Sequence, residues 1–223
     1  MAISVDTLYN LVNNDLAGLG RSGYTDNDQF NRMVNLAQVM MLEFYHNQYR
    51  NTSNIADAVR PFYVPDQKIS ITQGTGSLPD DYAHGLAVTT LQAVGCSGAP
   101  PRVAAIEVLP HEKWAVIHDP LVGATLLNPY FEFSSSGIRV WPIAITKIEL
   151  AYLRQPAEAE RAITTGANDT ETLDVANTTD LEWPATETGD FVSVLLAMKG
   201  IQVRDSEIAT FVANRFVNVI QQQ

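Results

Sequence analysis

The sequence predicts an α+β fold in which both ends of the chain form one helical domain and a β-rich module lies between them. Apolar residues recur at helical spacing near both ends, whereas several segments in the middle alternate apolar and polar residues as strands do. A polar segment separates the last predicted strand from the C-terminal helices. We therefore expect a helical domain from residues 1–65 and 181–223, a β-rich, sandwich-like module at 66–156, and an extended arm or loop at 157–180.

Two amphipathic helices are predicted near the N-terminus. The second extends from about Asp26 to Tyr49, and Thr25 and Asp26 can cap its first turn. At about 1.5 Å per residue this helix would be about 36 Å long, which is more than the core of a small domain needs. A short third helix is predicted at 54–60, where Pro61 ends it. The apolar residues at helical spacing are Val5, Leu8, Val12 and Leu16, then Phe30, Met33, Val34, Ala37, Met40, Met41, Phe44 and Tyr45.

Two more helices are predicted at the C-terminal end. The first carries the stripe of Phe191 and Val194 and ends at Gly200, and the second begins after Asp205. In the second helix, Phe211 and Phe216 are five residues apart and so diverge by about 140° around the axis, which one core can hardly accommodate. The predicted contacts to another subunit are therefore Phe211, Phe216 and Val217, together with Trp183, an aromatic residue expected in the core or at such a contact.

The middle of the chain contains several predicted strands. The segments 130–133 and 138–141 flank Ser-Ser-Ser-Gly, which is typical of a hairpin. The segment 148–154 alternates apolar and polar residues until Pro156. One or two helical turns are predicted at 111–117. The remaining predicted strands are 68–72, 85–94 and 102–109.

The predicted arm is polar and acidic. Its composition cannot bury enough apolar surface to offset the entropy of ordering it, so we expect it to be mobile in an isolated chain and ordered against neighbours. One interpretation of its acidic residues is a solvated surface, and the other is a surface that faces DNA without binding it or meets a basic partner. The candidate acidic residues of the arm are Glu158, Glu160, Asp169, Glu171 and Asp174.

Composition limits the classes of function. The net charge of −11, from 14 basic and 25 acidic residues, argues against a protein that coats DNA, because such binding needs Lys and Arg to neutralise phosphates. No apolar run is long enough to span a bilayer, and the first residues lack the basic start of a signal peptide. The single cysteine, Cys96, excludes an internal disulfide and fits a reducing cytoplasm. We expect no membrane association.

Motifs for catalysis, metal binding or cofactor binding are not found in the sequence. The glycines of 73–77 lack the Lys-Ser/Thr of a phosphate-binding loop, so a turn is expected there. His111 and His118 are seven residues apart, whereas two metal ligands on one helix face are four apart. Asp80 and Asp81 follow Leu-Pro and are expected to form a turn. We therefore predict no enzymatic activity, no metal and no cofactor.

The order of four segments resembles neck proteins of tailed bacteriophages, in particular the head-to-tail adaptor or tail tubular ring proteins of short-tailed phages. The resemblance extends from Thr25 to Gln221. The segments are Leu-Pro-Asp-Asp-Tyr at 78–82, Gly-Ile-Arg-Val-Trp-Pro at 137–142, Ile-Glu-Leu-Ala-Tyr-Leu-Arg-Gln-Pro at 148–156 and Gly-Ile-Gln-Val-Arg-Asp at 200–205.

This resemblance implies a structural virion protein made in the host cytoplasm. It implies a homo-oligomeric ring, usually a dodecamer, that joins the portal to further neck or tail proteins while DNA passes through the lumen without specific binding. In such a ring, Phe211, Phe216, Val217 and Trp183 would contact a neighbour or the portal. The alternatives are another minor capsid or tail component, or a small soluble binding domain or enzyme with a sandwich-like sheet.

Overall fold

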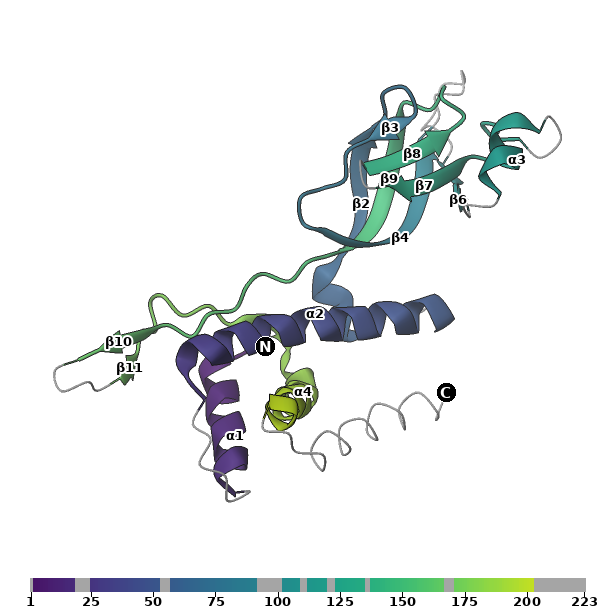
Figure 1. The fold of residues 1–223 in the computed structure, drawn as a ribbon. Coiled ribbons are helices and arrows are strands. Elements are labelled where there is room, and N and C mark those ends of the chain that lie inside the picture. Colours follow the sequence, from purple (N-terminus) through teal and green to yellow (C-terminus); the bar gives the residue numbers. More distant parts are fainter. Residues whose placement is uncertain are drawn as a thin grey trace. The chain divides into compact units, whose positions relative to one another are not determined.

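A computed structural model divides the chain into two units (Figure 1). The helical unit combines Met1–Pro61 with Pro156–Gln223, and the β unit is Phe62–Gln155. The predicted α+β class is confirmed. The predicted arm at 157–180 falls within the helical unit and is not a separate part. The residues that the structure describes are 2–18, 25–52, 57–91, 102–108, 112–119, 123–134, 137–166 and 171–202.

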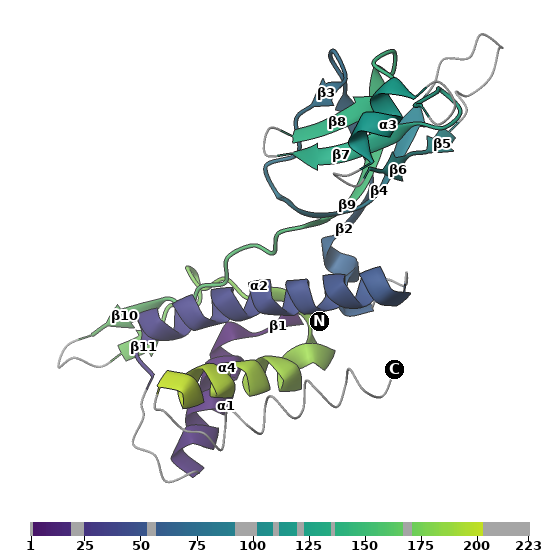
Figure 2. The same ribbon diagram turned by 45° about the vertical axis from the view of Figure 1, so that its right-hand side comes forward.

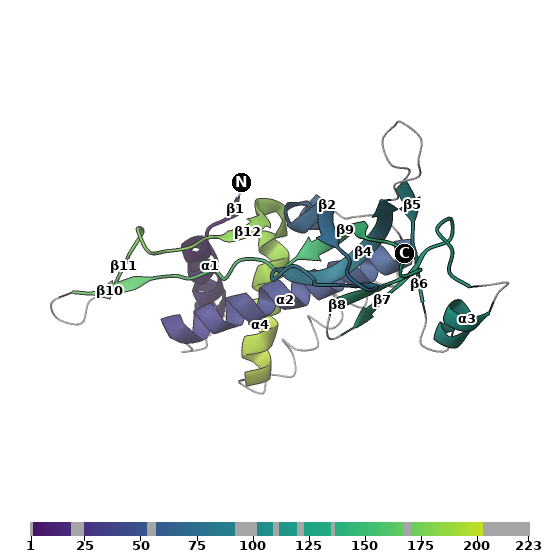
Figure 3. The same ribbon diagram turned by 90° about the horizontal axis from the view of Figure 1, so that it is seen from above.

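The described part of the helical unit contains helices from both ends of the chain. Strands β1 and β12 pair antiparallel, with Ile3 opposite Leu181, and Figure 3 shows them side by side. The elements are β1 (Ala2–Ile3), α1 (Val5–Gly18), α2 (Asn27–Thr52), η1 (Asp57–Phe62), β10 (Ile163–Thr165), β11 (Glu171–Leu173), β12 (Leu181–Pro184), η2 (Ala185–Glu187) and α4 (Thr188–Gln202).

One apolar core holds the helices of this unit together. Residues that lie far apart in the sequence meet there, because the stripes of α1, α2 and α4 each need a partner surface. Phe30 and Tyr9 make an edge-to-face contact with ring centroids 5.0 Å apart. The fully or nearly fully buried side chains include Val5, Leu8, Val12, Phe30, Met33, Val34, Ala37, Met41, Leu42, Leu181, Trp183, Phe191, Val194 and Leu195.

The start of α1 depends on a residue from the other end of the chain. The Asp180 carboxylate accepts a hydrogen bond of 3.0 Å from the backbone N–H of Val5, in the first turn of α1. A carboxylate at this position satisfies a backbone donor and interacts favourably with the helix dipole. Asp180 therefore ties β12 to α1 in addition to the strand pairing.

Two predicted helix ends are wrong. Helix α4 continues past Gly200 to Gln202, and the predicted third helix is the 3₁₀-helix η1, which contains Pro61 instead of ending before it. A 3₁₀ turn has fewer internal hydrogen bonds for a proline to remove, which explains why Pro61 is tolerated. The predicted C-terminal helix, with Phe211, Phe216 and Val217, lies outside the described residues.

The β unit consists of two four-stranded sheets, which Figure 2 shows one in front of the other. The first has the order β2-β9-β4-β5 and the second β3-β8-β7-β6. The elements are β2 (Tyr63–Ser70), β3 (Thr75–Gly76), β4 (Tyr82–Leu91), β5 (Arg102–Ala104), β6 (Ile106–Glu107), α3 (Lys113–His118), β7 (Tyr130–Ser134), β8 (Gly137–Trp141) and β9 (Lys147–Arg154).

Most of the sequence predictions for this unit are confirmed. The hairpin is β7–β8, the alternating segment is β9, and the helical turns are α3. The turn at 73–77 is present, with Gln73 and Gly74 at φ of 52° and 78°. The segment 102–109 is not one strand, because β5 pairs with β4 in the first sheet whereas β6 pairs with β7 in the second.

The core of the β unit contains side chains from both sheets. The buried cluster consists of Ile69, Ile71, Val88, Phe131, Ile138, Val140, Ile145, Ile148, Leu150 and Tyr152. Strand β9 is central in its sheet, and its Glu149 is buried and pairs with Arg102, with an N–O distance of 3.2 Å. Glu149 is thus an exception to the rule that charged residues of a strand face solvent.

A hydrogen bond at the start of β4 makes this unit sensitive to alkaline pH. The Tyr152 hydroxyl donates to the Asp81 carboxylate at 2.9 Å, and Asp81 ends the turn that precedes β4. Burial, followed by this hydrogen bond, raises the pKa of Tyr152 to about 12. The folded state therefore keeps a proton that an unfolded tyrosine loses near pH 10, so the associated stability is present below about pH 10 and is lost as the pH rises towards 12.

Tyr152→Phe is expected to flatten this pH dependence. The variant loses the hydrogen bond, which costs about 1 kcal/mol at neutral pH, but it has no hydroxyl to ionise. Urea unfolding at pH 8, 10 and 11.5 should therefore show a smaller decrease in the free energy of unfolding for Tyr152→Phe than for the native protein. Identical decreases in the free energy of unfolding of the two proteins would show that Tyr152 does not cause the pH dependence.

Candidate functional site

The start of the predicted arm is bound to α2 by a ladder of amide side chains. Asn35 makes two hydrogen bonds with the backbone of Ala159, at 3.0 and 2.9 Å, and Asn31 makes two with Arg161, at 3.2 and 3.0 Å. Gln38 donates to the carbonyl of Ala157 at 3.1 Å, and Asn27 to that of Arg161 at 2.7 Å. The amides therefore bind alternate residues of an extended chain.

The geometry of this amide ladder follows from two regular repeats. Residues four apart on a helix are about 6 Å apart along its axis and lie on the same side. Residues two apart in an extended chain are about 6.6 Å apart. Asn27, Asn31 and Asn35 can thus each reach the segment 157–161. Sequence reasoning missed these residues, although their four-residue spacing was the available signal.

Arg161 fixes the other side of the same segment. Its guanidinium donates to Asp6 at 2.8 Å and to the side-chain oxygen of Asn27 at 3.0 Å, and it lies 4.0 Å from the ring centroid of Tyr9. Only 12 % of the Arg161 side chain is exposed, so these interactions are largely shielded from solvent. The expectation that the whole arm is ordered only by neighbouring subunits is therefore wrong for 157–161.

The double substitution Asn31→Ala, Asn35→Ala is expected to release this segment. It removes the four hydrogen bonds to the backbone of this segment and the one from Gln38 to Asn35, and it leaves backbone groups of Ala159, a residue that is 1 % exposed, without these partners. Each unsatisfied buried group costs about 1–3 kcal/mol. Limited proteolysis should then cut near residues 157–162 much faster than in the native protein.

Asn47→Ala, at an exposed position of the same helix, is the matched control and should leave the cleavage rate unchanged. Equal protection in the double variant would mean that the ladder does not hold the segment.

The rest of the predicted arm contains a short hairpin. Strands β10 and β11 pair antiparallel, and the hydroxyls of Thr164 and Thr172 are 2.8 Å apart across the pair. Asp174 follows β11 and accepts hydrogen bonds from Ala176 and Asn177, and the side-chain bond from Asn177 lowers the pKa of the Asp174 carboxyl. An isolated two-stranded hairpin is marginally stable in water, so this element needs a further surface.

The structure places the acidic residues of the predicted arm in three different situations. Glu158, Glu160 and Glu171 are exposed, Asp174 is engaged in its own turn, and Asp169 lies outside the described residues. They belong to a wider acidic region: residues 156–190 contain nine acidic residues, and Arg161 is the one basic residue among them.

Trp183 is a core residue and not a surface contact. Its side chain is fully buried, with its ring centroid 5.4 Å from that of Phe191 and 6.1 Å from that of Tyr45. The Tyr45 hydroxyl donates to Glu187, and burial followed by this hydrogen bond raises the pKa of Tyr45. The prediction that Trp183 is available to a subunit or portal is therefore corrected, because β12 directs Leu181 and Trp183 inward.

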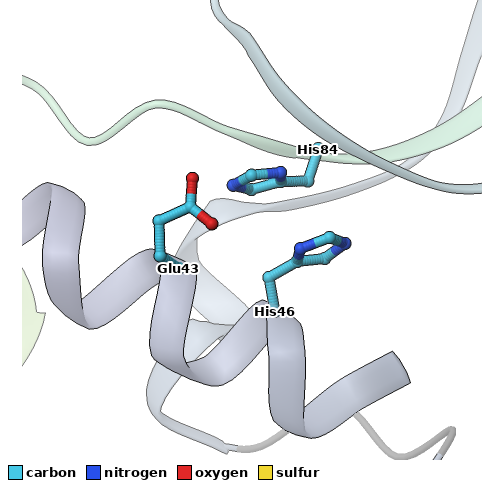
Figure 4. Close-up of side chains that lie close together, drawn as sticks. All are labelled: Glu43, His46 and His84. Carbon is cyan, nitrogen blue, oxygen red and sulfur yellow. The ribbon is translucent and has the colours of Figure 1, made fainter. Parts of the chain in front are cut away.

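Groups that could catalyse a reaction or bind a metal do not converge within either unit as far as the structure describes it. Asp81 is hydrogen-bonded to Tyr152, and His111 lies outside the described residues. Figure 4 shows Glu43 and His46 one turn apart on α2, with ligand atoms within 4.8 Å, and His84, which belongs to the β unit. Two ligands from one helix are fewer than the three protein ligands of a catalytic zinc site.

Comparison with known proteins leaves the chain without an assigned family. No family model and no curated protein matches it. Within the described residues, no helix is long and apolar enough to cross a membrane.

Proposed function

We propose that this chain is a structural protein of the neck of a tailed bacteriophage, where it forms a ring that connects the portal to the tail. The resemblance of four sequence segments to head-to-tail adaptors suggested this function. The inserted arrangement supports it, since a helical unit built from both chain ends can pack in a ring while the β unit forms a separate module.

The main support for this proposal is the uneven distribution of charge between the two units. The helical unit contains 17 acidic and 8 basic residues, whereas the β unit contains 8 and 6, so nearly all of the net charge of −11 belongs to the helical unit. DNA that passes through a channel must not adhere to its wall, and acidic side chains repel phosphates. A helical unit of net charge −9 is suited to such a wall.

Unpaired elements of the helical unit support self-assembly. Among the strands that the structure describes, β10 and β11 pair only with each other, and three apolar side chains of α2 are about half exposed: Leu36 (55 %), Val39 (53 %) and Met40 (49 %). Contiguous exposed apolar patches often mark contacts with other proteins. In this proposal the C-terminal segment with Phe211, Phe216 and Val217 contacts a neighbour or the portal, and dodecamers are the expected rings.

Electron microscopy of the purified chain tests this function. Class averages are expected to show rings that dock on the tail-facing end of portal rings from the same phage. The chain truncated before Asn214 is the comparison, because it should stay soluble and folded but no longer enter rings or virions. A chain that forms no ring, and neither binds portal nor occurs in purified virions, would disprove the proposal. If the truncated chain unfolds, the C-terminal residues removed by the truncation belong to the core. If the truncated chain still forms normal rings, these residues are dispensable for assembly.

A further inference from the structure

The outer face of the first sheet of the β unit carries a group of basic side chains. On the central strand β9, Ile148 belongs to the core between the sheets, so the residues on either side of it, Lys147 and Glu149, face outward. Lys68 on β2 is opposite Glu149 in the register and shares its face. Arg102 on β5 reaches the same face, because its Nη2 atom is 3.2 Å from a carboxylate oxygen of Glu149. Lys68, Lys147 and Arg102 together form the basic face.

The positive charge of the basic face is only partly balanced. All three of its residues are exposed, with 61 % of the Arg102 side chain accessible, whereas the one carboxylate among them, Glu149, is buried. The amines of Lys68 and Lys147 make no hydrogen bond or ion pair with another residue that the structure describes. Asp66, the one acidic residue of β2, lies in a bulge outside the regular register. A chain of net charge −11 therefore has a locally basic surface.

The strands between these cations form a flat surface. The outward residues of β4 and β9 in this part of the sheet include Ala87, Thr89 and Ala151, whose small side chains let an extended chain approach closely. Such side chains cannot stack on bases, and three cations displace few counterions from a nucleic acid. The acidic chain as a whole also repels phosphates. The basic face is therefore better suited to an acidic protein segment than to DNA.

The segment 157–161 of the helical unit presents two carboxylates outward. Its backbone is held by the amide ladder on one side, and on the other side Glu160 and Thr179 exchange two backbone hydrogen bonds, at 3.0 and 2.7 Å. Ala159 is buried, whereas Glu158 and Glu160, which alternate with it, are both exposed. A backbone that is already fixed loses little conformational entropy on binding.

These two carboxylates match two amines of the basic face in number and in spacing. Residues two apart in an extended chain, as Glu158 and Glu160 are, lie about 6.6 Å apart. Diagonal neighbours on adjacent strands, as Lys68 and Lys147 are, lie about 7–8 Å apart. Each carboxylate of one copy can thus meet one amine of another copy.

We propose that the basic face of one copy of the chain binds the segment 157–161 of a second copy, with Glu158 and Glu160 paired to Lys68 and Lys147. The two surfaces differ, so the contact is heterologous and leaves one surface of each kind for the next copy. A contact of this type can close into a ring. It rests on the proposed function and deepens it, because it names the surfaces through which neighbours in the ring contact each other.

A single contact of this kind is expected to be weak and sensitive to salt. Exposed ion pairs contribute little individually and are screened by salt. Around a ring the contact recurs for every copy, so the small contributions act together. Opposite charges also select the register and orientation of the segment and disfavour wrong ones.

Zero-length crosslinking with a carbodiimide tests the contact directly, because this reagent joins an amine to a carboxylate only when the two groups are in contact. The sample is a mixture of isotope-labelled and unlabelled full chain. Mass spectrometry is expected to find peptides in which Lys68 or Lys147 of one label is joined to Glu158 or Glu160 of the other.

The ion pair between Lys113 and Glu132, with an N–O distance of 2.6 Å inside the β unit, is the internal control and should crosslink within one label. If this control reacts but no mixed-label crosslink joins the basic face to the segment 157–161, the proposal is overturned. This holds whether the chain is then monomeric or associates through other surfaces.

Charge reversal tests whether these pairs drive association. The variants Lys68→Glu, Lys147→Glu and Glu158→Lys, Glu160→Lys are each expected to weaken association about tenfold in sedimentation velocity. General repulsion predicts a different result. The second variant exchanges two negative for two positive charges, which changes the net charge from −11 to −7 and would strengthen association if repulsion alone mattered.

An equimolar mixture of the two double variants should recover native association, because the reversed face of one then meets the reversed segment of the other, and the two native surfaces also meet. Neither variant alone has such a pair. A mixture that associates no better than the separate variants, while circular dichroism shows native folds, overturns the proposal. Arg139→Glu on β8, an exposed position of the second sheet, is the matched control for Lys147→Glu and should leave association unchanged.

Two further results separate this contact from other roles of the same surfaces. If Lys68→Glu, Lys147→Glu assembles normally but loses affinity for duplex DNA, the basic face binds nucleic acid and the proposal is overturned. Rings on the portal without mixed-label crosslinks would overturn the contact and leave the proposed function standing. Mixed-label crosslinks in a chain that never forms rings would support the contact and count against the proposed function.

Discussion

Replacing Trp183 with alanine is expected to lower the free energy of unfolding of the helical unit by about 3–5 kcal/mol. The indole is fully buried between Tyr45 and Phe191, on a strand that joins the two ends of the chain. Removing it leaves a cavity that the neighbouring rings can fill only in part. A loss of this size is a large fraction of the 5–15 kcal/mol by which native proteins are stable.

Urea unfolding followed by far-ultraviolet circular dichroism at 222 nm measures this effect, because the helices belong mainly to this unit. Trp114→Ala is the matched control, since Trp114 is 72 % exposed on α3 of the β unit and should cost less than about 1 kcal/mol. Trp183→Phe should give an intermediate loss. If Trp183→Ala cost no more than Trp114→Ala, Trp183 would not be part of the core.

Replacing Gly137 with alanine is expected to destabilise the β unit by at least about 3 kcal/mol. Gly137 begins β8 with φ of 127°, a conformation that side chains rarely adopt and that alone costs about 1–3 kcal/mol. A Cβ atom at this position would also lie 2.2 Å from the carbonyl oxygen of Gly76, so β3 and β8 could not keep their pairing.

Hydrogen exchange of the β3, β7 and β8 amides would show this change as a loss of protection confined to the β unit. Gly189→Ala in α4 is the control, because no atom other than those of its chain neighbours and of the backbone of its own helix lies within 4 Å of the position of its Cβ. That substitution should leave stability unchanged or raise it by about 0.4–1 kcal/mol. Native protection in Gly137→Ala would show that the turn adopts another conformation at little cost.

The strands of the β unit were the most predictable part of the fold. The alternation in 148–154 and the glycine between two aromatic-rich segments are local patterns, and the structure forms β9 and the β7–β8 hairpin there. A sandwich-like module was expected, but which strand belongs to which of its two sheets could not be predicted. This assignment depends on β3 pairing with β8 and on the separation of β5 from β6 at Ala105, which are set by packing between residues far apart in the chain.

The helices of the helical unit could be predicted from the sequence, but the extended segment that binds along α2 could not. Apolar spacing on α2 identified the core face, whereas the sequence offered no apolar signal for the segment 157–161, because amides bind its backbone and not its side chains. Met40 was grouped with the core but is about half exposed, whereas Met41 beside it is buried. Met41 and the next residue, Leu42, are both buried, so Met40, which is about 100° from Met41 and 200° from Leu42 around the axis, faces away from the core.

The capping of Val5 by Asp180 has a consequence for synthesis. The two residues are 175 positions apart, so α1 and α2 leave the ribosome long before the strand and helix that cover them. The β unit is continuous in sequence and can fold as soon as β9 has left the ribosome. The apolar faces of α1 and α2 remain exposed until β12 and α4 have been synthesised. Proteolysis of nascent chains stalled after the β unit should therefore cut within α1 and α2 but spare β2 to β9. The protein is expected to depend on chaperones mainly during this interval.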